Sequence, residues 1–531
     1  MAVTRRAWRA WRARHLLAVA LATASVLVVS VLPAAAKSTK TTTTTTTKPA
    51  TVTTAPPLPS FDTTLAWADC GDGFQCATLT VPVDWANPTG EQVGIAMTRL
   101  PATDPAQRIG SLVVNYGGPG QGGVDYLRKT YGRLPAEARA RFDIVSFDPR
   151  GTGASRPVDC VDDAVLDLAT GLPPIPDTEP ALAAYQQYNA TFAKGCTERM
   201  GAYAGQVGTR NVARDVEAMR VALGEPKLNY LGYSYGTILG EAYAQMYPGN
   251  MRTMALDGPP DYSLPMRDYN YQQAKGFADA LSAFLNWCEQ TQCSLTRAGN
   301  PRDALNQLVA RTATDPIPAD YTLDGQTRTG TLDGSLLQTG VIALLYDQAR
   351  GWPLLADALR DAAQDNWGGQ LLAYADSYLG RDPDGRYSST MVEANSVINC
   401  VDRPAAKHQP TNAHILADVA LFQQQLPPWG GGWAAPTCVG MPKPAKGDKL
   451  GDLTVKGAPP ILVIGTTGDP ATPYAGAQAT VQKVAGSTLL TYDATEHTAY
   501  GSGRSGCIDD AVDRYLVDLT VPAPGTHCSP N

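Results

Sequence analysis

The chain has 531 residues, of which 44% are hydrophobic and 18% are charged, and its formal net charge is −7. This composition is typical of a folded protein with a large core, and the length allows more than one domain. The acidic balance argues against a nucleic acid partner, because proteins that bind nucleic acids carry basic surfaces that neutralise phosphates.

The first residues have the pattern of a secretion signal. Five arginines precede an apolar run from Leu16 to Leu32, and small residues follow at positions 34–36. This order predicts a signal peptide over residues 1–36, with no stable membrane insertion after its cleavage. The alternative is an uncleaved anchor, since the apolar run is long for a signal core but short for a membrane span. A pair of arginines leaves both the general and the twin-arginine export route open.

Residues 37–59 are rich in threonine and proline and include the run Thr41 to Thr47. Such a segment cannot bury a core, so it predicts a disordered linker. We therefore expect a secreted protein, either extracellular or associated with the cell wall through this stalk.

The ten cysteines are expected to form disulfides, because a secreted protein folds in an oxidising compartment. They fall into pairs that are local in the sequence. The predicted bridges are Cys70–Cys76, Cys160–Cys196, Cys288–Cys293, Cys400–Cys438 and Cys507–Cys528. Metal binding is the alternative, but no pair has Cys-x-x-Cys spacing and no histidine cluster accompanies them, so we expect no metal and no cofactor.

From about Phe61 the pattern alternates between strands and helices. Short apolar runs predict strands at residues 93–100, 111–115, 142–147 and 253–256. Residues 211–223 have the apolar spacing of an amphipathic helix, which ends at Gly224. This alternation predicts an α/β fold with a mostly parallel sheet that is covered on both faces.

The segment from Leu228 to Thr237 places a Gly-x-Ser-x-Gly motif between an apolar strand and a helix that stops at Pro248. This order describes a nucleophile elbow, with Ser234 as the nucleophile. Side chains at Gly232 and Gly236 would collide with the neighbouring strand and helix. The helix N-terminus favours the negative charge that develops at the serine. The alternative is a chance match in a glycine-rich chain, which the flanking strand and helix argue against.

The alternation of strands and helices stops between about Asp257 and Lys456, where the chain becomes helix-rich and holds two of the five cysteine pairs. Helices are predicted at residues 274–287, 332–345 and 354–363. We interpret residues 258–456 as a helical lid inserted between two parts of an α/β-hydrolase core, residues 60–257 and 457–531. The sheet resumes at residues 460–465 and 487–492, and a last helix spans about 509–519.

A nucleophilic serine needs a base and an orienting carboxylate. Of the five histidines, only His497 lies in a loop directly after the last strand. Asp469 follows a buried strand and therefore stands at the carboxyl end of the sheet, where active sites of such folds gather. The chain order Ser, Asp, His is that of the α/β-hydrolases. The alternatives are an ordinary loop histidine and an Asp-Pro turn.

An oxyanion hole needs two backbone N–H donors. One is expected from Tyr235, which follows the nucleophile, and the other from the glycine loop after the strand at residues 111–115. Pro119 has no N–H, so Gly118 is the first candidate and Gly120 the second. The alternative is a plain Gly-Pro turn; a phosphate loop is excluded because no Gly-Lys-Ser or Gly-Lys-Thr follows.

Five segments together carry a family resemblance: Asn115–Gly120, Asp148–Gly153, Gly232–Thr237, Gly468–Pro473 and His497-Thr498. In this order they resemble the secreted actinobacterial tripeptidyl aminopeptidases, which belong with the proline iminopeptidase-like α/β-hydrolases. The resemblance covers nearly all of the chain after the stalk. It implies an exopeptidase that releases short peptides, such as tripeptides, from substrates with a free N-terminus. The chain departs from the family at Gln121, where a small residue is usual, and at Glu496, where glycine commonly precedes the histidine.

An aminopeptidase must bind an ammonium group, and buried carboxylates are one means. The candidates are Asp402 and Glu393, in a segment that the Cys400–Cys438 bridge would hold; the alternative for each is a solvated or helix-capping acid. Three functions are thus open. The first is a serine exopeptidase, the second is a secreted esterase or lipase with the same three residues, and the third is a wall-associated binding protein without activity.

Overall fold

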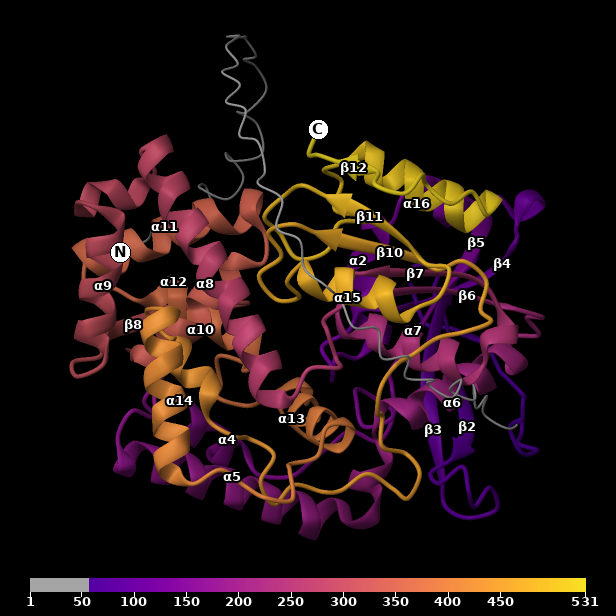
Figure 1. Ribbon diagram of the computed structural model, residues 1–531, viewed down its shortest axis with the longest axis horizontal. Coiled ribbons are helices and arrows are strands. Elements are labelled where there is room, and N and C mark those ends of the chain that lie inside the picture. Colours follow the sequence, from indigo (N-terminus) through magenta and orange to yellow (C-terminus); the bar gives the residue numbers. More distant parts are fainter. Residues whose placement is uncertain (1–56) are drawn as a thin grey trace, which may run out of the picture. The chain divides into compact units, whose positions relative to one another are not determined.

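The computed structural model describes residues 57–531 (Figure 1). The predicted signal peptide and all but the last residues of the predicted linker lie outside the described residues. The centre of the described part is a ten-stranded sheet with the order β1-β2-β3-β5-β4-β6-β7-β10-β11-β12. The strands are β1 (Ala68–Asp69), β2 (Gln75–Pro82), β3 (Gln92–Leu100), β4 (Gly110–Asn115), β5 (Phe142–Phe147), β6 (Leu228–Tyr233), β7 (Met251–Asp257), β10 (Leu462–Thr466), β11 (Thr488–Tyr492) and β12 (His527–Cys528).

Strands β4 to β12 of this sheet pair in parallel, whereas β1, β2 and β3 form an antiparallel edge that joins β5. Every residue of β4 and β5 is buried, as expected for central strands with helices on both faces. The fold is that of an α/β-hydrolase, as the sequence predicted.

Two hydrophobic clusters cover the two faces of the sheet. Val113 belongs to the cluster that includes helices α6 (Thr209–Ala222) and α7 (Tyr235–Met246). Its neighbours Leu112 and Val114 belong to the cluster that includes α2 (Gly123–Thr130) and α16 (Gly506–Asp518). Successive side chains of a strand point to opposite faces, so one short apolar run supplies both clusters.

After β7 the chain forms a helical region with its own core. Its elements are α8 (Met266–Thr291), α9 (Pro301–Thr312), β8 (Ile317–Leu323), β9 (Gln326–Leu332), α10 (Gly334–Leu345), α11 (Gln348–Gln364), α12 (Gly369–Leu379), α13 (Met391–Asp402) and α14 (Asn412–Gln425). Phe284, Leu337 and Trp352 are buried in this separate cluster. Figure 1 shows most of these helices, in red and orange, gathered together rather than stacked on the sheet. Helix α13 is the exception, because Val397 and Val401 belong to the cluster that covers one face of the sheet. We call residues 258–456 the cap.

The hairpin of β8 and β9 was not among the predicted elements. Its turn is Asp324-Gly325, and both residues have positive φ angles, of 50° and 84°. An Asp-Gly pair is a strong hairpin signal, so this element was readable from the sequence.

Two further helices, α4 (Asp163–Thr170) and α5 (Glu179–Met200), lie between β5 and α6, in a segment that the sequence assigned to the core. Helix α5 packs against the cap helix α14, because Leu182 forms a buried cluster with Ile415 and Val419. The Gln186 side chain also donates a hydrogen bond of 2.9 Å to Asn412. Two separate insertions therefore contact one another, although the sequence indicated only the second.

All five predicted disulfides are present, and no cysteine among residues 57–531 is left free. Cys160–Cys196 ties the loop after β5 to α5, and Cys400–Cys438 ties α13 to the segment that leads back to the sheet. No helix in this described range is long and apolar enough to cross a membrane.

Candidate active site

The turn between β6 and α7 has the geometry of a nucleophile elbow. Ser234 has a φ of 55°, which is strained for a residue with a Cβ atom. A Cβ on Gly232 would lie 2.4 Å from the Gly236 carbonyl oxygen, and one on Gly236 would lie 2.5 Å from the Asn115 carbonyl oxygen. The two glycines are therefore required by close approach of the backbone, and they leave Ser234 at the tip of the turn.

Asp469 and His497 meet at the carboxyl ends of β10 and β11. The Nδ1 atom of His497 lies 2.9 Å from each carboxylate oxygen of Asp469. The same carboxylate accepts hydrogen bonds from the amides of Ala471 (2.9 Å) and Thr472 (2.8 Å). Because Asp469 is only 3% exposed, these donors hold it in one orientation, and it in turn orients the imidazole.

Thr472 is a member of this site that the sequence analysis missed. Its hydroxyl donates to Asp469 (2.9 Å) and lies 3.3 Å from Nδ1 of His497. The segment Asp-Pro-Ala-Thr turns so that the aspartate accepts amides two and three residues later, which is a common local motif. That spacing was the signal that pointed to Thr472.

Ser234 and His497 line one cavity of about 260 Å³, which we call the His497 cavity. Within the described range the Ser234 hydroxyl makes no hydrogen bond, while its backbone amide donates to the carbonyl of Asp257 at 2.8 Å. Hydrogen bonds between catalytic groups are often long in a free enzyme and tighten when substrate binds. The structure thus brings the three predicted side chains to one site and fixes the backbone of each.

A second buried carboxylate, Asp257, acts on the same histidine. Its side chain accepts hydrogen bonds from the amides of Ala499 (2.9 Å) and Tyr500 (2.8 Å), just after His497. Burial raises the pKa of Asp257 to about 7. Burial by itself would lower the pKa of His497, but the charges of Asp469 and Asp257 and the hydrogen bond that the imidazole donates to Asp469 outweigh it, so the pKa is raised.

We expect Asp257→Asn to move the acid limb of the pH profile to lower pH. The base must be neutral to accept a proton, and removal of the negative charge of Asp257 lowers the pKa of His497. Asparagine still accepts the two loop amides, so the loop stays in place. The measurement is the rate at which a fluorophosphonate labels the protein between pH 5 and 9, and an unchanged or higher midpoint would contradict this account.

The glycine loop after β4 lies against the elbow. A Cβ on Gly117 would lie 2.6 Å from the Tyr233 carbonyl oxygen, which shows how closely the two backbones approach. Gly118, with a φ of 103°, lines a second cavity of about 430 Å³ together with Ser234 and Tyr235. We call it the Gly118 cavity. Neither the Gly118 nor the Tyr235 amide donates a hydrogen bond to any group in residues 57–531, as expected of oxyanion donors.

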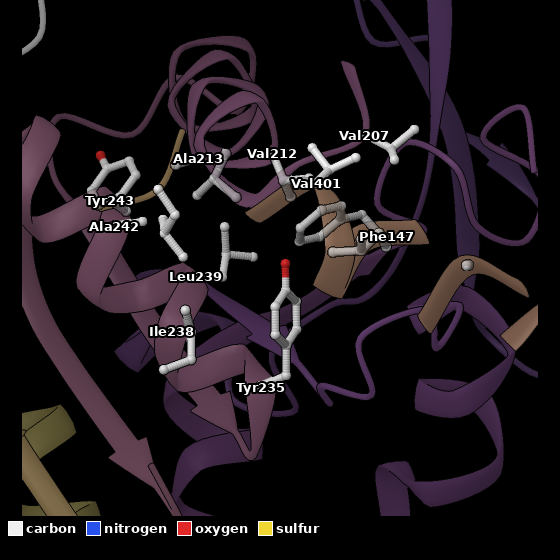
Figure 2. Close-up of a cluster of buried hydrophobic side chains, with 14 of the residues drawn as sticks. Phe147, Val207, Val212, Ala213, Tyr235, Ile238, Leu239, Ala242, Tyr243 and Val401 are labelled. Atoms are coloured by element: carbon white, nitrogen blue, oxygen red, sulfur yellow. The ribbon is translucent and has the colours of Figure 1, made fainter. Parts of the chain in front are cut away.

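The side chain of Tyr235 is placed for packing. Figure 2 shows it pointing from the elbow into the buried cluster that holds Val212 and Phe147. Its hydroxyl contacts the hydroxyl of Thr209, at the start of α6. Any contribution of Tyr235 to oxyanion binding therefore comes from its backbone amide.

The structure places Asp402 and Glu393, the two carboxylates predicted to bind the substrate amine, against backbone amides of the protein. Asp402 accepts hydrogen bonds from the amide (2.8 Å) and hydroxyl of Thr209, and Glu393 accepts from the amides of Cys160 (2.7 Å) and Val161 (3.2 Å). Neither carboxylate lines either cavity beside Ser234. Both satisfy buried backbone amides. For Asp402, which accepts from the first residue of α6, this is the helix-capping alternative noted above, whereas the amides that Glu393 accepts lie in the loop before α4.

The cap also contacts His497. The His497 amide donates to the Tyr346 carbonyl (2.9 Å), and the ring of Tyr346 meets the imidazole edge-on, with centroids 5.3 Å apart. Asp347 pairs with Glu496 as a β-bridge, and Arg504 forms ion pairs with both acids. Glu496, one of the two departures from the family pattern, therefore helps to join the cap to the catalytic loop.

The other departure, Gln121, donates to the Gly122 carbonyl at 3.1 Å and lines neither cavity. For residues 57–531, no three histidine, cysteine, aspartate or glutamate side chains gather in a way that could hold a metal ion.

Comparison with known proteins agrees with this geometry. A family model described as the alpha/beta hydrolase fold matches residues 110–316, and one described as TAP-like protein matches residues 424–528. Serine protease Hip1 of Mycobacterium tuberculosis is 36% identical over 470 residues, which cover 86% of this chain and 87% of the relative. The chain belongs to the TAP-like family of α/β-hydrolases. The family resemblance inferred from the five sequence motifs is thereby confirmed.

Two further relatives show the range of names in the TAP-like family. Tripeptidyl aminopeptidase of Streptomyces lividans is 30% identical over 488 residues, which cover 88% of this chain and 86% of the relative. Carboxylesterase B of Mycobacterium tuberculosis is 33% identical over 470 residues, which cover 86% of each chain. Like them, this TAP-like protein is a serine hydrolase of the α/β-hydrolase fold.

Proposed function

We propose that the protein is a secreted serine exopeptidase that releases short peptides, in particular tripeptides, from the free N-terminus of peptide substrates. The observation that carries the proposal is the arrangement around Ser234. Ser234 shares one cavity with His497, which Asp469 orients, and a second cavity with Gly118 and Tyr235, whose backbone amides have no partner within residues 57–531. The cap helps to form this second cavity.

The chemistry follows from these groups. The Ser234 hydroxyl oxygen attacks the scissile carbonyl while His497 Nε2 takes its proton, and the amides of Gly118 and Tyr235 bind the oxyanion. The C–N bond then breaks as His497 gives that proton to the leaving amine, and the peptide stays as an ester on Ser234. Water, activated by His497, attacks this acyl-enzyme, so the released peptide leaves and the serine recovers its proton.

The lining of the Gly118 cavity favours a peptide over an acyl ester. Side-chain amides stand on its wall: Asn270, Gln273, Gln338, Asn395 and Asn399. A peptide brings backbone N–H and C=O groups that need hydrogen-bond partners once they leave water. The Asn395 and Asn399 side chains already bond within the protein, but the Gln338 amide and the side-chain oxygens of Asn270 and Gln273 have no partner within residues 57–531. An apolar acyl chain would leave those groups without partners, which makes a lipid-like ester a poor occupant.

The amine of the substrate is expected to meet neutral acceptors, since no carboxylate lines the Gly118 cavity within residues 57–531. The amide oxygens and tyrosine hydroxyls on its wall accept hydrogen bonds from an ammonium group. Tyrosine and tryptophan faces, such as those of Tyr378 and Trp433, also attract cations.

Secretion is supported by two features of the chain. The N-terminal pattern is that of a signal peptide, and five disulfides fit a protein that folds outside the cytosol. The threonine-rich segment that follows the signal would serve as a spacer at the cell wall.

The proposal is tested with a panel of chromogenic substrates. We expect turnover of unblocked tripeptidyl anilides, and a loss of roughly 10- to 100-fold in kcat/KM when the N-terminus is acetylated, because a charged hydrogen-bond donor is removed. If acyl esters alone are cleaved, the second candidate holds: a secreted esterase, which the similarity to carboxylesterase B supports. If a fluorophosphonate fails to label Ser234, the binding-protein hypothesis replaces both.

A further inference from the structure

Ser234 lies between two cavities of different character. The Gly118 cavity, of about 430 Å³, contains both oxyanion donors, whereas the His497 cavity, of about 260 Å³, contains neither of them. Tyr346 of the cap stands on the wall of both. A substrate bound across Ser234 must therefore place its two halves in different surroundings.

The direction of the reaction assigns the two halves, if the proposed peptidase function holds. The scissile carbonyl oxygen must reach the amides of Gly118 and Tyr235, which places the acyl half in the Gly118 cavity. The leaving nitrogen must receive its proton from His497, which places the leaving segment in the His497 cavity.

The His497 cavity is lined by three arginines and two acids. Arg504 pairs with both acids, with Nε at 3.2 Å from Glu496, and Arg350 has its Nε at 3.7 Å from Asp347. The guanidinium of Arg133 makes no ion pair and no hydrogen bond with any group in residues 57–531. The cavity thus has an excess positive charge, and Arg133, which is exposed, is the arginine on its wall without a charged partner in residues 57–531.

Arg133 is placed beside an aromatic wall. It ends a short 3₁₀ helix (Tyr131–Arg133) that follows α2. In the same cavity, the ring of Tyr116 stacks on that of Tyr233, with centroids 5.7 Å apart and planes within 4° of each other. The ring centroid of Tyr126 lies 4.5 Å from that of Tyr116. These rings offer an apolar surface to the leaving segment, and the small volume keeps any charged group of that segment near the scissile bond.

We propose that the His497 cavity binds the leaving segment and that Arg133 selects segments with a carboxylate close to the scissile bond. The carboxylate is either the C-terminus of a short leaving segment or an acidic side chain. A guanidinium binds a carboxylate through two parallel hydrogen bonds, which fixes its position as well as its charge. Arg350, which comes from the cap helix α11, adds less because Asp347 already offsets its charge.

Four substrates with the same N-terminal tripeptide test this proposal. The first is a tetrapeptide with a free C-terminus, the second is its C-terminal amide, the third is an amide with aspartate as the leaving residue, and the fourth is the tripeptidyl anilide. We expect the wild type to cleave the free acid or the aspartyl amide roughly 3- to 30-fold better than the neutral amide, as kcat/KM. The preferred member of the pair identifies the source of the carboxylate.

Arg133→Gln is expected to bring the ratio of kcat/KM for the charged substrate to that for the neutral amide close to one, while kcat/KM for the anilide, which carries no carboxylate, falls by a much smaller factor than that for the charged substrate. Arg350→Gln should reduce the preference by a smaller factor. Lys129→Gln is the matched control, because Lys129 is an exposed cation four residues away that does not line the cavity. Added salt should weaken the wild-type preference, since the ion pair between Arg133 and the substrate carboxylate is partly exposed and salt screens it.

Two results would overturn the proposal. One is a wild type that cleaves the neutral amide as well as the charged substrates. The other is a preference that survives in Arg133→Gln, or that Lys129→Gln removes equally, since a general field and not a local contact would then be responsible. The anilide separates this failure from failure of the proposed function, because a wild type that leaves the anilide intact is not a tripeptidyl peptidase at all.

Discussion

Replacement of Ser234 by alanine is expected to lower kcat/KM by roughly 10⁴- to 10⁶-fold, because the attacking oxygen is lost while the oxyanion donors and the cavities remain. Alanine has a Cβ atom like serine, so the strained φ of 55° costs both residues about the same and the fold should persist. The variant should therefore unfold at the same temperature as the wild type and should no longer react with a fluorophosphonate.

The control for this variant is Ser388→Ala, which removes the hydroxyl of an exposed serine that lines neither cavity beside Ser234. It should retain full activity. Residual activity of Ser234→Ala above about one per cent of wild type would show that another group attacks the carbonyl. Loss of the nucleophile alone normally removes as much activity as loss of the whole triad.

Asp469→Asn is expected to lower kcat/KM by roughly 10³- to 10⁴-fold. Nδ1 of His497 lies 2.9 Å from both oxygens of Asp469, so the carboxylate keeps the proton on Nδ1 and leaves Nε2 free to accept the serine proton. The NH₂ group of asparagine instead donates to Nδ1, which moves the ring proton to Nε2. Both kcat/KM and the rate of fluorophosphonate labelling should fall together.

The chain supplies a matched control for this second variant. Asp493 follows the neighbouring strand β11 and pairs with His527 at the same distance of 2.9 Å, but both side chains are exposed and lie outside the two cavities. Asp493→Asn should leave activity unchanged. If kcat/KM of Asp469→Asn stayed within tenfold of the wild type, Asp257 would be the carboxylate that supports the histidine. Asp257 is the other buried acid whose charge raises the pKa of His497.

The cap and the catalytic loop meet through the Tyr346 carbonyl and the bridge between Asp347 and Glu496. The histidine is therefore held both by the sheet, through Asp469, and by the cap. The sequence located His497 from its position after the last strand. It did not indicate the contact with the cap, because that contact joins segments that are far apart in the chain.

Much of the fold was readable because its signals are local. The apolar runs of β4 and β5 and the glycines on either side of Ser234 each occupy a few neighbouring positions. Ser234, Asp469 and His497 are far apart in the sequence, but each lies in a short motif that directly follows a strand. The cysteine pairs were readable for the same reason, since each bridge closes a loop of fewer than forty residues.

The roles of buried polar groups depended on the tertiary structure. Glu393 and Cys160 are 233 residues apart, and only their contact shows that this acid accepts a hydrogen bond from a backbone amide. The contact of α5 with α14, and the division of the site into two cavities, likewise arise from surfaces brought together by folding. A sequence specifies which residues are able to do chemistry, because chemistry and local turns are properties of residue type and spacing. Which of them face a substrate is decided by burial and hydrogen-bond partners, which exist only once distant segments have packed.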